Sequence, residues 1–362
     1  MKKKVLGALA LVVAMGLPAS ANASLQSLSD MFVFGDSLSD GGNSGIVSRA
    51  ATGGTVTFPP APYYNGQYSN GPVAVEYLWQ SYNGGASFAP SLAGGTNYAI
   101  GGATSGVENY NSFSSSTGPL APAYNQLGNN WQLNTFAAQL AGGRTFDPAT
   151  SLFVVWLFPN DVFLANSNSL LPGTAGGGLG GPLPYPGGLS NLNNVSALIT
   201  NGVTNIAYTV SALANMGAQH FLVPNMPDLG KTPDVLGTSA AAGLSLLSQT
   251  FNFYLAQAMS QLDAALTSAE IVQFDTMGTL DDVIGNPNAY GIKNVTQQCI
   301  LNYVACAADN FQWLFWDSVH PTTYAHRFLA AEFQAAIPEP ESIFLLAVGL
   351  LGIFVTRRKP AA

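Results

Sequence analysis

Two short segments near opposite ends of the chain carry residues that can act together as a nucleophile and its base. They read Phe34-Gly35-Asp36-Ser37-Leu38-Ser39-Asp40 and Asp317-Ser318-Val319-His320-Pro321-Thr322. A serine hydroxyl is a weak nucleophile until a histidine takes its proton and a carboxylate holds that histidine in the right tautomer. Ser37, His320 and Asp317 supply these groups, and the chemistry they predict is acyl transfer, such as ester hydrolysis.

The spacing within the second segment supports this interpretation. Asp317 precedes His320 by three residues, so in a turn its carboxylate can reach Nδ1 of the ring and leave Nε2 free to face a serine. Each segment alone has an ordinary explanation, because serines often stabilise turns and histidines are often exposed in them. The other two histidines, His220 and His326, are expected to be structural.

The elements that must position these residues alternate along the chain. Short apolar runs predict buried strands, which are residues 31–34, 97–100, 153–157, 221–223 and 271–274. Helical spacing of apolar residues predicts helices between them, over residues 131–140, 203–214 and 244–266, and a last helix from Thr322. We therefore expect an α/β fold, a three-layer α/β/α sandwich around a central, mostly parallel five-stranded sheet, with ligands bound at the carboxyl ends of the strands.

Four sequence blocks in order resemble the GDSL or SGNH family of esterases and lipases, whose blocks supply a Ser, a Gly, an Asn and a His. The resemblance covers about residues 29–333 and lies in residues 34–40, 97–104, 160–161 and 317–322; residues 223–233 are also similar to a segment of the lipase-like branch. It implies the flavodoxin-like SGNH-hydrolase fold and a Ser37-His320-Asp317 triad. It further implies an oxyanion hole made by the Ser37 N–H, the Gly102 N–H and the Asn160 side-chain amide.

These three donors suit the chemistry that the triad predicts. Negative charge gathers on the ester oxygen during attack, and donors already aimed at that oxygen lower the barrier. The chain departs from the family pattern at one position, because Phe158 stands where the third block usually carries a Gly. A large ring there is expected to narrow the acyl pocket or to shift the Asn160 amide.

Both ends of the chain have the composition of export signals. Residues 1–23 carry three lysines, an apolar run and Ala21-Asn22-Ala23, which is the order of a secretory signal peptide. Residues 337–362 carry Pro338-Glu339-Pro340, an apolar stretch over residues 343–355 and a basic end. The sequence thus predicts a signal peptide (1–23), a hydrolase domain (24–336) and a C-terminal signal (337–362) with a short transmembrane helix.

The C-terminal array resembles the PEP-CTERM sorting signal that exosortases process in Gram-negative bacteria. The resemblance implies signal peptidase and exosortase as processing partners, transient anchoring at the inner membrane, and a final place in the cell envelope, on the cell surface or outside the cell. A plain membrane anchor is the alternative, although the apolar stretch is short beside the roughly 20 residues of an ordinary span.

The net charge of the predicted domain argues against polyanionic partners. Six of the 11 basic residues but only two of the 19 acidic ones lie in the two ends, which leaves a net charge of about −12 on the predicted domain. Nucleic acids and anionic membranes reward clustered Lys and Arg, so neither is an expected partner.

Cys299 and Cys306 are the chain's two cysteines. An even count at short spacing favours a disulfide in an exported protein, and no third thiol or nearby histidine completes a metal site. We expect no metal and no organic cofactor, because the predicted mechanism needs neither.

The substrate is the least determined feature. Long polar loops contain aromatic residues that can bind an acyl chain, stack on a sugar or pack the loop down, among them Phe58, Tyr63, Tyr64, Tyr68 and Tyr110. The main hypothesis is a secreted esterase or lipase acting on a lipid or other acyl ester. A polysaccharide O-acetyl esterase and a non-catalytic surface or matrix protein on a hydrolase fold are the alternatives.

Overall fold

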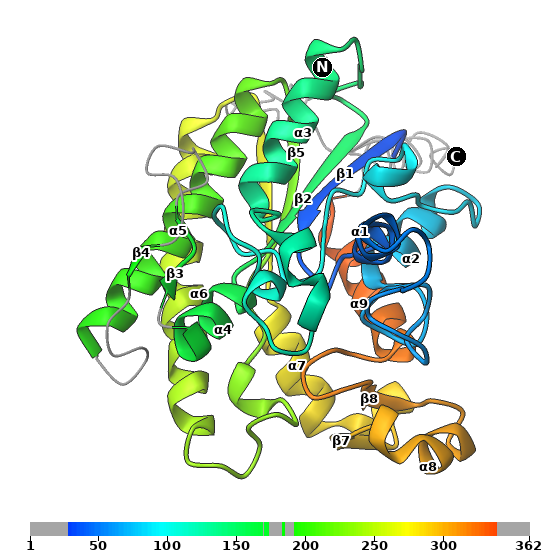
Figure 1. The fold of residues 1–362 in the computed structure, drawn as a ribbon. Coiled ribbons are helices and arrows are strands. Elements are labelled where there is room, and N and C mark those ends of the chain that lie inside the picture. The colour runs from blue at the N-terminus through cyan, green and yellow to red at the C-terminus, as the bar shows by residue number, and fades with distance from the viewer. Residues whose placement is uncertain (1–27, 169, 174–182, 185–191, 339–362) are drawn as a thin grey trace, which may run out of the picture.

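A sheet of four parallel strands forms the centre of the protein (Figure 1). The computed structural model describes residues 28–168, 170–173, 183–184 and 192–338. The strands lie in the order β1 (Asp30–Gly35), β2 (Ser151–Trp156), β5 (His220–Pro224) and β6 (Glu270–Phe274). All four contain residues of the predicted strand segments, and their parallel pairing confirms the expected sheet.

Alternate residues of the strands face two separate cores, because successive side chains of a strand point to opposite faces. Phe32 and Phe153 lie in one core together with residues of α3 (Asn129–Ala141), α5 (Leu192–Asn215) and α6 (Ala241–Ala265). Met31 and Leu152 face the other core, where α2 (Ala74–Tyr82) and α9 (Thr323–Ala336) pack. The result is the predicted three-layer α/β/α sandwich.

The fifth position of the sheet holds a segment that pairs with β1 without forming a regular strand. Asn97 makes a parallel bridge to Val33, and the backbone N–H groups of Tyr98 and Ile100 donate to the carbonyl oxygens of Val33 and Gly35. On its other side the Asn97 carbonyl accepts from the Ser91 N–H. The expected strand over residues 97–100 is thus placed at the sheet edge as a short paired segment.

Further elements gather beyond the carboxyl ends of the strands. They are α1 (Asn43–Ala51), α4 (Pro159–Asn168), α7 (Thr276–Gly285), α8 (Tyr303–Ala308), the antiparallel pair β3 (Leu170–Leu171) and β4 (Leu183–Pro184), and the parallel pair β7 (Asn294–Gln298) and β8 (Trp313–Phe315). Figure 1 shows β7, β8 and α8 together at one corner of the molecule, beside α7.

The last helix begins where the sequence predicts. Thr322 is its N-cap residue, and its hydroxyl accepts a hydrogen bond from the Ala325 N–H. The Thr322 hydroxyl also donates to the carbonyl oxygen of Trp313 in β8. This cap fixes the start of α9 directly after the segment that carries His320.

No helix among the described residues is long and apolar enough to cross a membrane. The predicted signal peptide (1–23) and the apolar stretch over residues 343–355, to which the sequence assigns membrane anchoring, lie outside the described residues.

Candidate active site

Ser37 lies in a tight turn directly after β1. The Asp36 side chain shapes this turn, because its Oδ1 accepts a hydrogen bond from the Leu38 N–H at 3.0 Å. Gly35 leaves little room for a larger residue, since a Cβ there would lie 3.1 Å from the carbonyl oxygen of Trp156. The turn therefore holds Ser37 at the carboxyl end of the first strand.

Asp40 connects this turn to the segment that contains Gly102. Its Oδ1 accepts from the N–H groups of Gly42 and Asn43, and its Oδ2 accepts from the Gly101 N–H at 2.8 Å. A fully buried carboxylate with several donors is well satisfied. The first two sequence blocks are thus fixed relative to each other.

His320 bridges Ser37 and Asp317. Its Nε2 lies 2.8 Å from Ser37 Oγ, and its Nδ1 lies 2.7 Å from Asp317 Oδ2. Asp317 Oδ1 accepts hydrogen bonds from the backbone N–H groups of Val319 and His320, at 2.9 and 2.8 Å, so the carboxylate closes the turn that carries the histidine. Residues 283 positions apart in the chain meet here through one imidazole ring.

The surroundings of Asp317 favour its ionised form. Burial alone would raise the pKa of Asp317, but the facing His320 ring and the backbone donors outweigh burial and hold that pKa below its usual value. An ionised carboxylate at this position orients the imidazole and stabilises its protonated form.

Asp36, the neighbour of Ser37, differs from Asp317. Burial raises the pKa of Asp36 to about 7, because the hydrogen bond from Leu38 and the nearby His320 only partly offset the loss of hydration. Its Oδ2 has no hydrogen-bond partner among the described residues.

The three predicted oxyanion donors lie on separate elements. Neither the Ser37 N–H nor the Gly102 N–H has an acceptor among the described residues. Gly102 has a φ of +80°, and a Cβ there would lie 2.4 Å from Asn109 Oδ1, so only glycine fits. Asn160 lies in the first turn of α4, where its Nδ2 donates to the Ala103 carbonyl at 3.2 Å.

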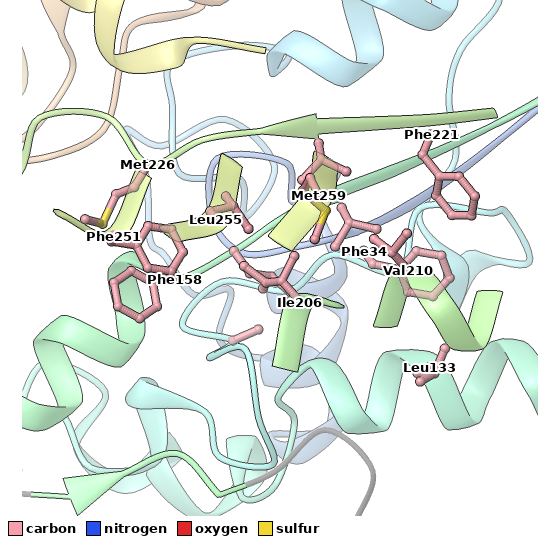
Figure 2. Packing of buried hydrophobic residues seen from close by; sticks show 14 of the residues in the cluster. Phe34, Leu133, Phe158, Ile206, Val210, Phe221, Met226, Phe251, Leu255 and Met259 are labelled. Atoms are coloured by element: carbon pink, nitrogen blue, oxygen red, sulfur yellow. The ribbon is translucent and has the colours of Figure 1, made fainter. Parts of the chain in front are cut away.

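Phe158 does not narrow the site, so the first of the two effects expected from the sequence is wrong. Its ring is fully buried and stacks on Phe251 of α6, with centroids 3.6 Å apart (Figure 2). Its φ of +118° lies in the region that favours glycine. This backbone conformation gives a physical reason for a glycine at the position, and it aims the Phe158 ring into the core.

An apolar pocket lies beside Ser37 and His320, and its cavity volume is about 90 Å³. Its walls come from the turn after β1, the end of β2, α4, residues 227–232, α7, β8 and α9, together with Ile292 before β7. The apolar side chains that line it include Leu38, Trp156, Val283, Ile292, Leu314, Phe315 and Phe328. Thr232 and Thr276 are among its few polar side chains. An environment of this kind suits a hydrocarbon chain.

Two aromatic side chains of the polar loops contact the triad residues rather than the apolar pocket. The Tyr63 hydroxyl donates to Asp317 Oδ2 at 2.7 Å, and the Tyr68 ring lies 5.1 Å from the His320 ring. The sequence indicates only that the loops are rich in aromatic residues. The motif that carries Asp317 contains no signal for its partner Tyr63, because the two are 254 positions apart.

The remaining histidines lie away from the pocket lining, as expected. His326 is buried in α9, where its Nδ1 accepts from the Ala74 N–H at 3.2 Å, and burial lowers its pKa to about 3. His220 is buried in β5, and its Nδ1 lies 3.7 Å from Glu270 Oε2. Burial also lowers the pKa of His220.

Cys299 and Cys306 form a disulfide, with their Cα atoms 5.3 Å apart. The bond leaves neither thiolate available to a metal. Among the described residues no cluster of three or more His, Cys, Asp or Glu side chains is arranged to hold a metal ion.

Comparison with known proteins agrees with these features. The chain is 27% identical to a protein encoded in the trpE-trpG intergenic region of Pseudomonas putida, over 88% of this chain and 50% of that protein. It is 24% identical to Lipase 1 of Photorhabdus luminescens, over 92% of this chain and 54% of that protein. The chain therefore spans about half the length of these two relatives. A GDSL esterase/lipase of Arabidopsis thaliana is 26% identical over 85% of this chain and 86% of its own.

A solved structure of a lipolytic G-D-S-L family member from Veillonella parvula is 13% identical in sequence. The match covers 84% of this chain and 96% of that protein's chain, with a TM-score of 0.41.

Residues 336–359 match the PEP-CTERM protein-sorting motif, which indicates export to the envelope or surface of a Gram-negative cell. Residues 31–333 match the family model described as GDSL-like lipase/acylhydrolase, and the chain belongs to that family.

Proposed function

We propose that this protein is an exported serine esterase that hydrolyses carboxylic esters with an apolar acyl chain. Membership of the GDSL-like lipase/acylhydrolase family supports ester hydrolysis in general, and the sorting motif supports export. One observation carries the finer assignment. Nε2 of His320 lies 2.8 Å from Ser37 Oγ, and Nδ1 of the same ring lies 2.7 Å from Asp317 Oδ2.

The reaction begins at Ser37. Its Oγ attacks the ester carbonyl carbon while His320 Nε2 takes the hydroxyl proton, and Asp317 stabilises the resulting imidazolium. The carbonyl oxygen becomes an oxyanion that accepts hydrogen bonds from the Ser37 N–H, the Gly102 N–H and Asn160 Nδ2. The tetrahedral intermediate then collapses, the alcohol leaves with the proton from His320, and the acyl group stays on Ser37.

Water completes the cycle. His320 takes a proton from a water molecule that attacks the acyl carbon, a second oxyanion forms in the same hole, and the acid is released as the proton returns to Ser37 Oγ. Every proton is carried by His320, so the net reaction consumes one water and yields one acid and one alcohol.

The apolar pocket supports an acyl chain longer than acetyl. An acetyl group needs only a small site beside the nucleophile, whereas this pocket extends from Ser37 to α7, β8 and α9 with mostly apolar walls. Because each buried methylene contributes about 0.8 kcal/mol, such a wall rewards longer chains. Butyryl to lauroyl esters are accordingly the proposed range, in place of the O-acetyl groups of a polysaccharide.

The experiment is a comparison of p-nitrophenyl acetate, butyrate, octanoate and laurate, hydrolysed by the purified protein and by a Ser37→Ala variant. We expect kcat/KM to rise from acetate to octanoate, and the Ser37→Ala variant to lose activity and labelling by a fluorophosphonate probe. Equal inertness of both proteins toward all four esters and the probe would support a non-catalytic surface protein. Activity confined to acetate would support the O-acetyl esterase.

A further inference from the structure

The disulfide-closed segment between Cys299 and Cys306 exposes apolar side chains. Leu301 is 73% exposed, Val304 84% and Tyr303 47%. We call these three residues the apolar knob. The segment Cys-Ile-Leu-Asn-Tyr-Val-Ala-Cys contains no charged residue. Single exposed apolar residues are ordinary, but three of them at the start of α8 and directly before it favour contact with another apolar surface.

The segment is held in place, so the exposure of the knob does not reflect a loose loop. Both cysteines are fully buried, and they pack with Trp313 and Trp316. The N–H groups of Cys299 and Ile300 donate to the carbonyl oxygens of Phe315 and Trp316, at 3.0 and 2.8 Å. A rigid base presents the exposed side chains without the entropic cost of ordering them on contact.

The same base connects the knob to the active site. Trp316 accepts from the Ile300 N–H through its carbonyl and donates its own N–H to the His320 carbonyl at 2.7 Å. The preceding residues Leu314 and Phe315, in β8, line the apolar pocket. Figure 1 shows α8, which carries Tyr303 and Val304, next to β7 and β8. The knob and one wall of the apolar pocket therefore belong to a single small unit.

Charge and area restrict what can cover the knob. The predicted domain carries about −12 net charge, which opposes approach to an anionic surface. A stable dimer needs about 800 Å² from each partner, far more than three side chains supply. A neutral surface of water-insoluble ester needs only a few apolar side chains to dip into it, and binding to it grows with the apolar area buried.

We propose that the apolar knob docks the protein onto the neutral surface of an aggregated ester substrate, with Leu301 and Val304 entering that surface. The inference rests on the proposed function, because it assigns the physical form of the substrate that the Ser37 site takes. Docking would hold the protein at undissolved ester.

The test compares one ester, tributyrin, below its solubility limit and as an emulsion. The variant is Leu301→Gln/Val304→Gln, which keeps Tyr303 because its ring packs near Phe311 and Trp316. The matched control is Leu246→Gln/Phe253→Gln, which removes two side chains of α6 that are 64% and 58% exposed, away from α8 in Figure 1. The parent protein, the knob variant and the control share the same N-terminal and C-terminal residues, so those residues contribute equally to the three rates.

We expect the rate of the knob variant on emulsified tributyrin to be about tenfold lower than that of the parent protein, because two apolar side chains are no longer buried in the ester surface. It should keep its rate on dissolved tributyrin, and the control should match the parent protein on both. Equal rates of parent and knob variant on the emulsion overturn the proposal. So does a parent protein that is dimeric in light scattering while the knob variant is monomeric, because a second copy then covers the knob.

A binding arm separates this inference from the proposed function. Sedimentation with phosphatidylcholine vesicles should retain the parent protein and the control more than the knob variant, and added phosphatidylserine should weaken that retention. If no protein hydrolyses tributyrin but retention still depends on the knob, the esterase proposal fails and the docking surface stands. Retention that is equal in all three proteins overturns the docking surface.

Discussion

Phe158 stacks face to face on Phe251, with ring centroids 3.6 Å apart and ring planes inclined by 5° (Figure 2). Gly202 of α5 lies against the same ring, since a Cβ there would be 2.2 Å from it. The ring therefore fills a space between the start of α4 and the helices α5 and α6. Residues held at such a φ cost about 1–3 kcal/mol, and burial of the ring offsets that cost.

We predict that Phe158→Ala destabilises the protein by about 3–5 kcal/mol, because it leaves a cavity and keeps the strained backbone. Phe158→Gly should cost less, since glycine removes the strain. Urea denaturation measures both. The acyl-length preference on p-nitrophenyl esters should stay the same for both variants. A changed preference together with unchanged stability would place the ring in the pocket after all.

Asn160→Ala tests the third oxyanion donor. Removing such a donor lowers kcat by about 10²–10³-fold, while KM changes little because the oxyanion exists only near the transition state. Soluble p-nitrophenyl butyrate is a suitable substrate. A thermal melt serves as the control, since Asn160 also donates to the Ala103 carbonyl. Near-normal turnover would remove Asn160 from the oxyanion hole.

Tyr63→Phe removes one of the donors to Asp317 Oδ2. Burial, followed by the Asp317 charge, raises the pKa of Tyr63 well above its ordinary value, so the hydroxyl donates throughout the working range. Without this hydrogen bond the Asp317 carboxylate is less firmly fixed, and it orients the His320 ring less well toward Ser37. We expect kcat on p-nitrophenyl butyrate to fall several-fold with little change in KM. A thermal melt serves as the control for the fold, and a kcat equal to that of the parent protein would show that Tyr63 does not position the triad.

Val283→Phe should shorten the apolar pocket. Val283 lies on α7, is buried and lines the pocket. The larger ring takes space that a long acyl chain needs, so kcat/KM for laurate should fall at least about tenfold relative to acetate, the value of two lost buried methylenes. Val56→Phe, at an exposed position, is the control. An equal loss of kcat/KM on laurate and acetate would show that the substitution disturbs the catalytic site and does not change the acyl-length preference.

The sequence predicts features that are local and misses those that depend on distant packing. The strands are predictable because each contains a short run of mostly apolar residues, and the Asp317–His320 turn is predictable because its residues are three positions apart. The contact of Tyr63 with Asp317 and the direction of the Phe158 ring are not predictable in this way. Both depend on which segments, far apart in the sequence, the fold brings together. The sequence around one partner does not indicate which residue it contacts.

Buried carboxyl groups make the stability of the protein fall as the pH rises from about 4 to about 7, and this dependence levels off at higher pH. Burial is the largest cause that raises the pKa of Asp36, Asp161 and Glu76 to about 7 each, far above the values of unfolded carboxyl groups. The folded protein thus binds more protons than the unfolded chain, and the free energy of unfolding falls as the pH rises through about 7. His326 and His220 have lowered pKa values and contribute in the opposite sense only below about 7, where unfolded histidines become protonated.

We therefore predict that the melting temperature is higher at pH 6.5 than at pH 8.5, by several degrees, since about 1 kcal/mol corresponds to roughly 2–3 °C in a domain of this size. Glu76→Gln should make the difference smaller. Glu76 accepts from the Val73 N–H, and the amide oxygen of glutamine can replace that acceptor without a titrating group. Glu76 lines none of the pocket around Ser37, so activity serves as a control for the fold. A melting temperature that does not fall between pH 6.5 and 8.5 would mean that these carboxyl groups ionise in the fold at their ordinary pKa.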